Sequence, residues 1–303
     1  MNINFDLENV TVTEFGVGRY NEDSNIFSLI SSDAEIQDAL KEMAEETLNC
    51  MMALSDEPIL YDPSEKYKSQ EYLYLPIDND LAQRIHTLHS ANNLDIDNNA
   101  LENPDELSFY FARFIDGDGN RLTAIRRTTQ FKGVLKKRLI RLVTDTMRIV
   151  DDNIFKLDND FDLLADNQNV HILRPSGLEF IGQLKNAILE AVPGNIDNIR
   201  QEMDFVDFSN IQSYAETHSR AARYLASIHS REEMVNIDRD RLVNLCNRTG
   251  VQIDNDGEDI TIDDKDIMGF LEVLDRRRYE VDLVHESPES YKASSRSRLN
   301  RGG

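Results

Sequence analysis

The sequence has 303 residues and is strongly acidic, with 33 Lys and Arg against 56 Asp and Glu, for a formal net charge of -23. Its 40% hydrophobic content is enough to bury a core, which excludes wholesale disorder. No stretch approaches the roughly 18–20 apolar residues of a membrane helix, and the acidic first residues do not look like a secretory signal. The two cysteines, Cys50 and Cys246, fit a reducing compartment, so we expect a cytoplasmic protein.

In chain order, the first part of the sequence predicts short strands and then a helix. Residues 10–15 and 26–29 alternate in apolar character, as strands do. Ser32-Asp33 precedes apolar residues at helical spacing and predicts a helix start. Residues 72–76 then predict a strand, and residues 81–88 a short helix.

An Asn- and Asp-rich loop over residues 92–105 is the best candidate for a domain boundary. We therefore predict a variable α+β region over 1–104 and a second α+β domain over 105–303. The second domain is expected to hold, in order, hairpins over 107–127 and 155–173, helices over 177–247, a small hairpin and a final helix over 251–278, and a basic tail.

Turn residues place the ends of several of these elements. Residues 116–120 predict the turn of the first hairpin and 255–257 the turn of the small one. Pro193-Gly194 is expected to close a helix, and Asp263-Asp264 to open the last one. Strands grouped before helices predict an α+β fold, with a sheet-rich N-terminal half of antiparallel hairpins and a helix-rich C-terminal half.

Signatures of catalysis and of metal binding are missing from the sequence. It has no glycine-rich phosphate loop, no GxSxG elbow and no HExxH pair. The stretch 116–120 resembles the start of a calcium loop, but Arg127 stands where the bidentate Glu is needed. We therefore expect no cofactor, no metal and no catalytic residue. An alternative is a Mg²⁺-dependent nuclease that uses Asp263 and Lys265 after a strand, although helix capping explains the same residues.

The charge pattern is more informative. An acidic chain repels nucleic acid, so DNA binding needs a local basic patch. Residues 119–144 contain no acid and eight basic residues. We predict a helix near 135–143, with its leucines facing inward and its basic side chains outward, where they contact phosphates. The candidate DNA-binding residues are Arg126, Arg127, Lys132, Lys136, Lys137, Arg138 and Arg141. The alternative is a solvated face paired with surrounding acids. Residues 276–278 and the basic tail are candidates for a second patch.

The order of elements resembles a known family. The hairpin 109–114, the stretch Phe161-Asp162-Leu163-Leu164, the helix that opens Leu178-Glu179-Phe180, and the closing Tyr291-Lys292-Ala293-Ser294 are similar to the KwaB-like family of the bacterial Kiwa antiphage system, over about residues 105–300. The resemblance implies a DNA-binding effector that associates with itself and with the multi-span membrane protein KwaA. It also implies a cytoplasmic location at the inner membrane and a block of phage DNA replication or expression.

Three hypotheses follow. The first is a non-enzymatic DNA-binding defence protein that contacts phosphates through the basic stretch. The second is the nuclease named above. The third is a protein-binding adaptor whose acidic surface does the work.

Overall fold

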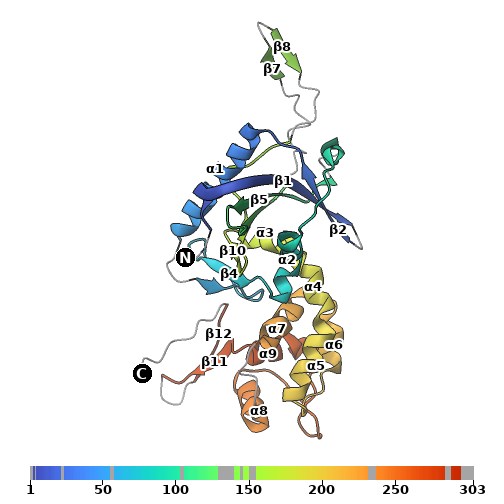
Figure 1. The fold of residues 1–303 in the computed structure, drawn as a ribbon. Helices are drawn as coiled ribbons and strands as arrows, with labels where there is room; N and C mark the ends of the chain where they lie inside the picture. Colours follow the sequence, from blue (N-terminus) through green and yellow to red (C-terminus); the bar gives the residue numbers. More distant parts are fainter. Residues whose placement is uncertain are drawn as a thin grey trace. The chain divides into compact units, whose positions relative to one another are not determined.

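The computed structural model describes residues 3, 5–21, 24–54, 58–102, 106–128, 140–143, 146–149, 155–230, 237–283 and 288–294. The chain forms two compact units, residues Met1–Leu60 with Ser69–Leu184, and Tyr61–Lys68 with Lys185–Gly303. Figure 1 shows strands such as β1 and β5 in the first unit and helices α5 to α9 in the second. The predicted α+β fold, with a sheet-rich first half and a helix-rich second half, is confirmed.

Within the described residues, the first unit holds one eight-stranded sheet in the order β2-β1-β5-β6-β9-β10-β4-β3. All its neighbours pair antiparallel except β3 and β4. The strands are β1 (Val10–Asn21), β2 (Ser24–Ile30), β3 (Ile59–Leu60), β4 (Leu73–Pro76), β5 (Phe109–Asp116), β6 (Arg121–Arg127), β9 (Leu163–Ala165) and β10 (Asn169–Ile172). The hairpin β5–β6 lies within the predicted range 107–127. The hairpin β9–β10 lies within the predicted range 155–173 but begins only at Leu163, since residues 155–162 form no strand.

The turn of the β5–β6 hairpin is held by its own polar residues. The Asp116 carboxylate accepts hydrogen bonds from the backbone N–H groups of Asp118 (2.9 Å) and Asn120 (2.8 Å). Gly119 has φ +82°, a conformation that costs glycine little. The calcium-like stretch is thus a tight turn in which Asp116 already caps the backbone.

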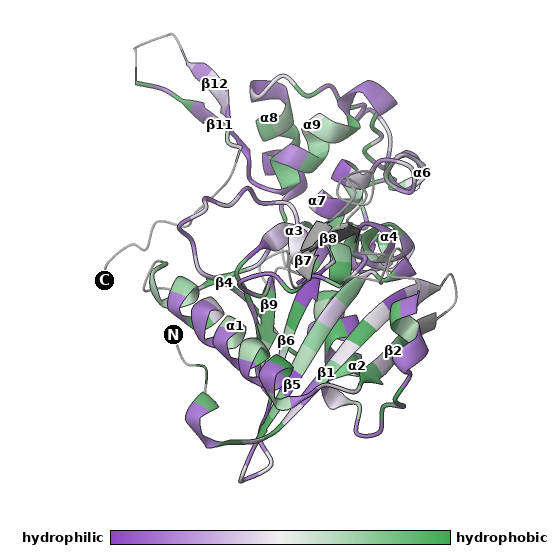
Figure 2. Cartoon of the chain, turned by 90° about the horizontal axis from the view of Figure 1, so that it is seen from above, coloured by the Kyte–Doolittle hydropathy of each residue, from purple (hydrophilic) through white to green (hydrophobic). Residues whose placement is uncertain are grey.

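Helix α1 (Ala34–Met52) packs on this sheet. It begins where the sequence predicts, because the Asp33 carboxylate accepts from the N–H of Ile36 at 2.9 Å. Its apolar side, including Leu40 and Met43, joins Tyr110 and Phe161 in one buried cluster. Figure 2 shows hydrophobic and hydrophilic residues alternating along α1, as expected for a helix with one buried side.

Other short helices of the first unit flank the sheet. Helix α2 contacts β6 and β9, and α3 contacts β6. These elements are η1 (Leu7–Asn9), η2 (Asp80–Ala82), α2 (Gln83–Ser90), η3 (Asn98–Glu102) and α3 (Pro175–Ile181).

The second unit is built around α7. It packs against α5, α6 and α9, and buries Leu225 and Ile228 with Phe270 of α9 among the core residues. Its elements are α4 (Leu184–Glu190), whose first residue closes the first unit, α5 (Val192–Glu202), α6 (Ser209–Ala215), α7 (Ser219–His229), α8 (Arg239–Arg248), α9 (Asp264–Leu274), β11 (Arg278–Val281) and β12 (Glu289–Lys292).

Some predicted boundaries were wrong. Pro193 lies in the first turn of α5 instead of closing a helix, because proline fits that turn, where its missing N–H is not needed. The hairpin expected over 251–262 is reduced to the single bridge between Asp254 and Thr261. Residues at the start of the expected basic tail form β12, which pairs with β11.

The compact units do not follow the expected division at 104/105. Strands β1, β2 and β4, from before that point, share one sheet with β5 and β6. The units instead separate within α4, and the short segment 61–68 belongs to the second unit. Of the helices described, none combines the length and the apolar character needed to cross a bilayer.

Candidate nucleic-acid interface

Arg126 and Arg127 end strand β6, at the start of the basic stretch. The Arg126 side chain is only 14% exposed and is surrounded by acids. Its Nη1 lies 2.7 Å from Asp162 Oδ1 and 3.4 Å from Asp160 Oδ1, and its Nε lies 3.3 Å from Asp158 Oδ2. Burial opposes the charge on Arg126, but these carboxylates outweigh it and raise its pKa. Arg126 therefore anchors the end of the strand, and its guanidinium already has carboxylate partners.

Asp162 is the centre of this cluster. Besides Arg126, it accepts from the backbone N–H of Arg127 at 2.9 Å and faces Arg174 Nη1 at 3.4 Å. Gly177 lies so close that a Cβ there would stand 2.5 Å from the Asp162 Cβ. The carboxylate thus ties the end of β6 to the start of α3. This explains the Asp in the Phe161-Asp162-Leu163-Leu164 stretch by geometry, because an uncharged side chain could not serve all three donors equally well.

Arg127 is presented differently. Its guanidinium carbon lies 5.2 Å from the centre of the Phe180 ring, and Phe180 is 41% exposed. Tyr20 of β1 packs edge-on against Phe180 with ring centres 6.0 Å apart, and Arg84 of α2 lies 5.6 Å from the Tyr20 ring. Arg127, Phe180, Tyr20 and Arg84 form what we call the aromatic–arginine platform. Arginines interleaved with partly exposed aromatics suit the phosphates and base faces of nucleic acid.

The sequence did not single out this platform. Its members come from β1, α2, β6 and α3, so no local motif joins them. The one available signal was Phe180, an aromatic residue in the family-like Leu178-Glu179-Phe180 stretch. The Tyr20 hydroxyl donates to the carbonyls of Phe180 (3.2 Å) and Ile181, which fixes α3 beside β1.

The remaining predicted DNA-binding residues are placed only in part. Lys132, Lys136, Lys137 and Arg138 lie outside the described residues. Arg141 lies on β7 (Ile140–Val143), which pairs with β8 (Thr146–Ile149) in a separate two-stranded sheet. The prediction of a helix was therefore wrong at 140–143, where β-branched Ile140 and Val143 favour a strand. The register pairs Arg141 with Arg148.

Of the basic cluster 276–278, Arg276 is exposed, whereas Arg277 and Arg278 are paired with acids. Arg277 is completely buried and lies 2.5 Å from the equally buried Asp275, and Arg278 pairs with Glu272 at 3.0 Å. Arg277 is thus an internal partner of an acid in the second unit, and Arg278 is a partly exposed one.

The residues of the nuclease alternative lie at the start of α9. Asp263 is the N-cap residue, without a side-chain capping bond, and Lys265 Nζ donates to Gln252 Oε1 at 2.9 Å. Among the residues with a described position, no group of three His, Cys, Asp or Glu side chains is arranged to hold a metal ion.

Comparison with known proteins identifies the family. The profile described as "Kiwa protein KwaB-like" matches residues 105–283, which is more than half of the chain. The chain belongs to the KwaB-like family. It is therefore a component of Kiwa antiphage defence, a system of partner proteins. The match begins at β5 and runs through both compact units to the strand β11. No curated protein and no solved structure matches the chain.

The family match includes most of the structure described above. Arg126, Arg127, Asp162 and Phe180 all lie inside residues 105–283, whereas Tyr20 and Arg84 lie before it. The KwaB-like part of the chain thus contains the acid-anchored end of β6 and the basic stretch that follows.

Proposed function

We propose that this KwaB-like chain binds DNA without cutting it and thereby blocks replication or expression of phage DNA. The observation that carries the proposal is the reversal of charge over residues 119–144, where a chain of net charge -23 has eight basic residues and no acid. A basic segment of this length can contact several phosphates and release the counterions bound to them. The affinity for DNA then falls as the salt concentration rises, because counterion release is less favourable in concentrated salt.

The geometry at the end of β6 supports two different roles within this segment. Arg126 is a positioning residue, since Asp158, Asp160 and Asp162 surround its guanidinium. Arg127 is a contact residue, because it lies over the exposed Phe180 ring beside the basic stretch. Phosphate contact through Arg127, Lys132, Lys136, Lys137, Arg138 and Arg141 needs little reading of bases.

The hairpin β7–β8 adds a second argument. It is a two-stranded ribbon, and the predicted contact residue Arg141 lies on its first strand. The dimensions of a two-stranded ribbon also allow it to follow a groove of the duplex.

We further propose that the chain acts at the cytoplasmic face of the inner membrane, held there by the membrane-embedded partner KwaA, and that it associates with itself. The support for these points is membership of the Kiwa system, in which the chain works with partner proteins. In this arrangement the acidic remainder limits binding to the cell's own DNA by repulsion.

The test is binding of labelled double-stranded DNA by fluorescence anisotropy over a salt series, with and without Mg²⁺. The variant Lys136→Glu/Lys137→Glu removes two phosphate contacts. The plot of log affinity against log salt should become shallower, with its negative slope reduced in magnitude by about 2. The control Lys185→Glu/Arg241→Glu makes the same charge change at exposed residues of α4 and α8. It should leave the slope unchanged.

A further variant examines the platform. Phe180→Ala removes the exposed ring under Arg127 and should weaken single-stranded DNA binding by about 1 kcal/mol or more, since stacking on a base is lost. Equal slopes for both charge variants would contradict the site. No binding at low salt would favour the protein-binding adaptor, and shortened DNA with Mg²⁺ would favour the nuclease with Asp263 and Lys265.

A further inference from the structure

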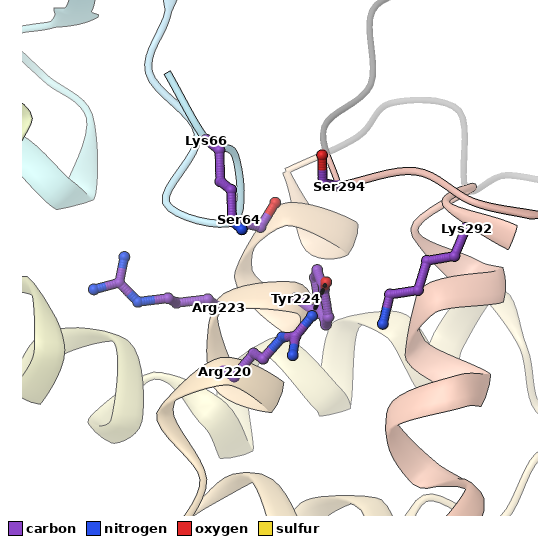
Figure 3. A pocket seen from close by; sticks show the side chains of 7 residues that line it. All are labelled: Ser64, Lys66, Arg220, Arg223, Tyr224, Lys292 and Ser294. Atoms are coloured by element: carbon purple, nitrogen blue, oxygen red, sulfur yellow. Dashed lines mark hydrogen bonds between the residues drawn. The ribbon is translucent and has the colours of Figure 1, made fainter. Parts of the chain in front are cut away.

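The second unit contains a pocket that DNA binding by the basic stretch does not use. It has a volume of about 540 Å³ and is lined by Ser64, Lys66, Arg220, Arg223, Tyr224, Lys292 and Ser294. These residues come from the segment 61–68, from α7 and from the end of β12, all within one compact unit. Figure 3 shows Arg220 and Lys292 approaching Tyr224 from two sides, while Arg223 extends away from it.

The lining is cationic although the chain is acidic. Arg220 and Lys292 have side chains 65% and 46% exposed, and both lie against the buried carboxylate of Glu272. Arg220 lies 3.7 Å from Glu272 Oε1 and donates through Nη2 to the Tyr224 hydroxyl at 3.3 Å. One buried carboxylate thus fixes two cations at the pocket without covering them.

The balance of charge stays positive. Glu272 is shared by Arg220, Lys292 and also Arg278, whose Nε lies 3.0 Å from Oε2. Lys66 adds an exposed positive charge from the opposite segment. Beyond these groups, Arg277 and Arg223 add two cations and Asp275, Glu65 and Asp62 add three carboxylates. Among the described residues around the pocket, six cations thus stand against four carboxylates, so an anion in the pocket would meet a net positive field.

Buried hydrogen bonds of Arg277 hold the walls of the pocket in place. Its completely buried guanidinium donates to the Ser294 carbonyl (2.6 Å), the Ser64 hydroxyl (3.0 Å) and Glu65 (2.8 Å). It also lies 5.1 Å from the centre of the Tyr224 ring, which Arg220 approaches at 5.7 Å. One side chain therefore holds the segment carrying Lys66 and the segment carrying Lys292 in place. A preorganised set of cations binds an anion at lower entropic cost than mobile ones do.

We propose that this pocket binds a small phosphate-bearing ligand of nucleotide size, with Arg220, Lys292 and Lys66 contacting its phosphates. The volume lies in the range of pockets for small molecules. Several cations from separate segments match an anion with several charges, and arginine offers phosphate a planar, paired donor geometry. The closing Tyr291-Lys292-Ala293-Ser294 stretch thereby gains a role, since it supplies one wall of the pocket.

The experiment measures binding to the full chain by isothermal titration calorimetry, at constant ionic strength. The probes are pyrophosphate, AMP and ATP, with citrate as an anion of similar charge but without phosphate. ATP or pyrophosphate should bind, and Lys66→Gln and Lys292→Gln should each weaken binding by about tenfold, as expected for the loss of one charged hydrogen bond. The matched control Lys185→Gln removes the same charge from an exposed residue of α4 in the same unit and should leave affinity unchanged.

Two sources can supply this phosphate chemistry, a free nucleotide or a DNA end. The dinucleotide pTpT, compared with TpT and with ATP, separates them. Tighter binding of pTpT assigns the pocket to a phosphorylated DNA end, and tighter binding of ATP assigns it to a nucleotide. The proposal is overturned if no phosphate probe binds, if citrate binds equally well, or if the pocket variants match the control.

A failure of the pocket proposal can be told apart from a failure of the proposed DNA binding. The same variants are measured for double-stranded DNA binding over the salt series. An unchanged salt slope with lost ATP or pyrophosphate binding separates the pocket from the basic stretch.

Discussion

Replacing Arg277 by methionine tests how the second unit is held together. The substitution keeps an unbranched apolar stem against Tyr224 but removes a guanidinium that is completely buried. Asp275, also completely buried, then loses the donor 2.5 Å from its Oδ2, while Ser227 Oγ stays 3.2 Å from its Oδ1. Removing one partner of a buried pair costs about 3–5 kcal/mol, because the other charge is left in a poorly solvated site.

That cost is a large part of a typical folding free energy of about 5–15 kcal/mol. Urea unfolding followed by circular dichroism measures it, and hydrogen exchange shows whether the loss of protection concentrates in segment 61–68, α7 and α9. The control Arg241→Met changes an exposed arginine of α8 and should shift stability by less than about 0.5 kcal/mol.

A second substitution separates charge from packing. Arg277→Met/Asp275→Asn contains no buried charge at this pair, so it should recover about 1–2 kcal/mol relative to Arg277→Met alone. The reasoning would be refuted if Arg277→Met cost less than about 1 kcal/mol, or if the added Asp275→Asn brought no recovery.

Two further predictions concern the first unit. Gly177→Ala places a Cβ 2.5 Å from the Asp162 Cβ and should lower the stability measured by thermal unfolding by about 1–3 kcal/mol. The control Gly194→Ala in α5 has nothing within 4 Å of the added Cβ and should be neutral or stabilising. Equal effects of the two variants would contradict the close packing at Gly177. Burial lowers the pKa of His89, partly offset by its hydrogen bond to Asn167. The unfolded chain has a histidine pKa of about 6.5, so between about pH 7 and pH 5 it binds more protons at this residue than the folded chain does. The free energy of unfolding should therefore fall as the pH drops from about 7 to 5. His89→Gln should flatten this dependence in urea titrations, and an unchanged slope would refute it.

The sequence by itself determined the elements whose signals are local. The Asp-Gly turn after β5 and the Asp33 cap of α1 depend on residues within a few positions, so composition and spacing predict them. The family-like stretches around Asp162 and Phe180 were also readable, although their roles were not.

The local sequence pattern gave a wrong prediction where the same pattern is compatible with two different structures. The spacing of leucines over 135–143 fits a helix, yet Ile140–Val143 pairs with Thr146–Ile149 as a ribbon, since cross-strand partners stabilise a strand that a helical pattern only permits. Pro193-Gly194 fits a helix end as well as a helix start, and here the proline lies in the first turn of α5.

Only the tertiary structure decided which charges are surface and which are internal. Arg126 and Arg277 read as members of basic clusters. The partners Asp158 and Asp162 of Arg126 lie 32 and 36 positions away. Arg277 pairs with Asp275, two positions away, and with Glu65, 212 positions away. Charge counts along the chain reveal neither the distant pairs nor the burial of the local one. The cost of burying a charge selects them during folding, because an arginine enters the interior only where acids are already positioned to meet it.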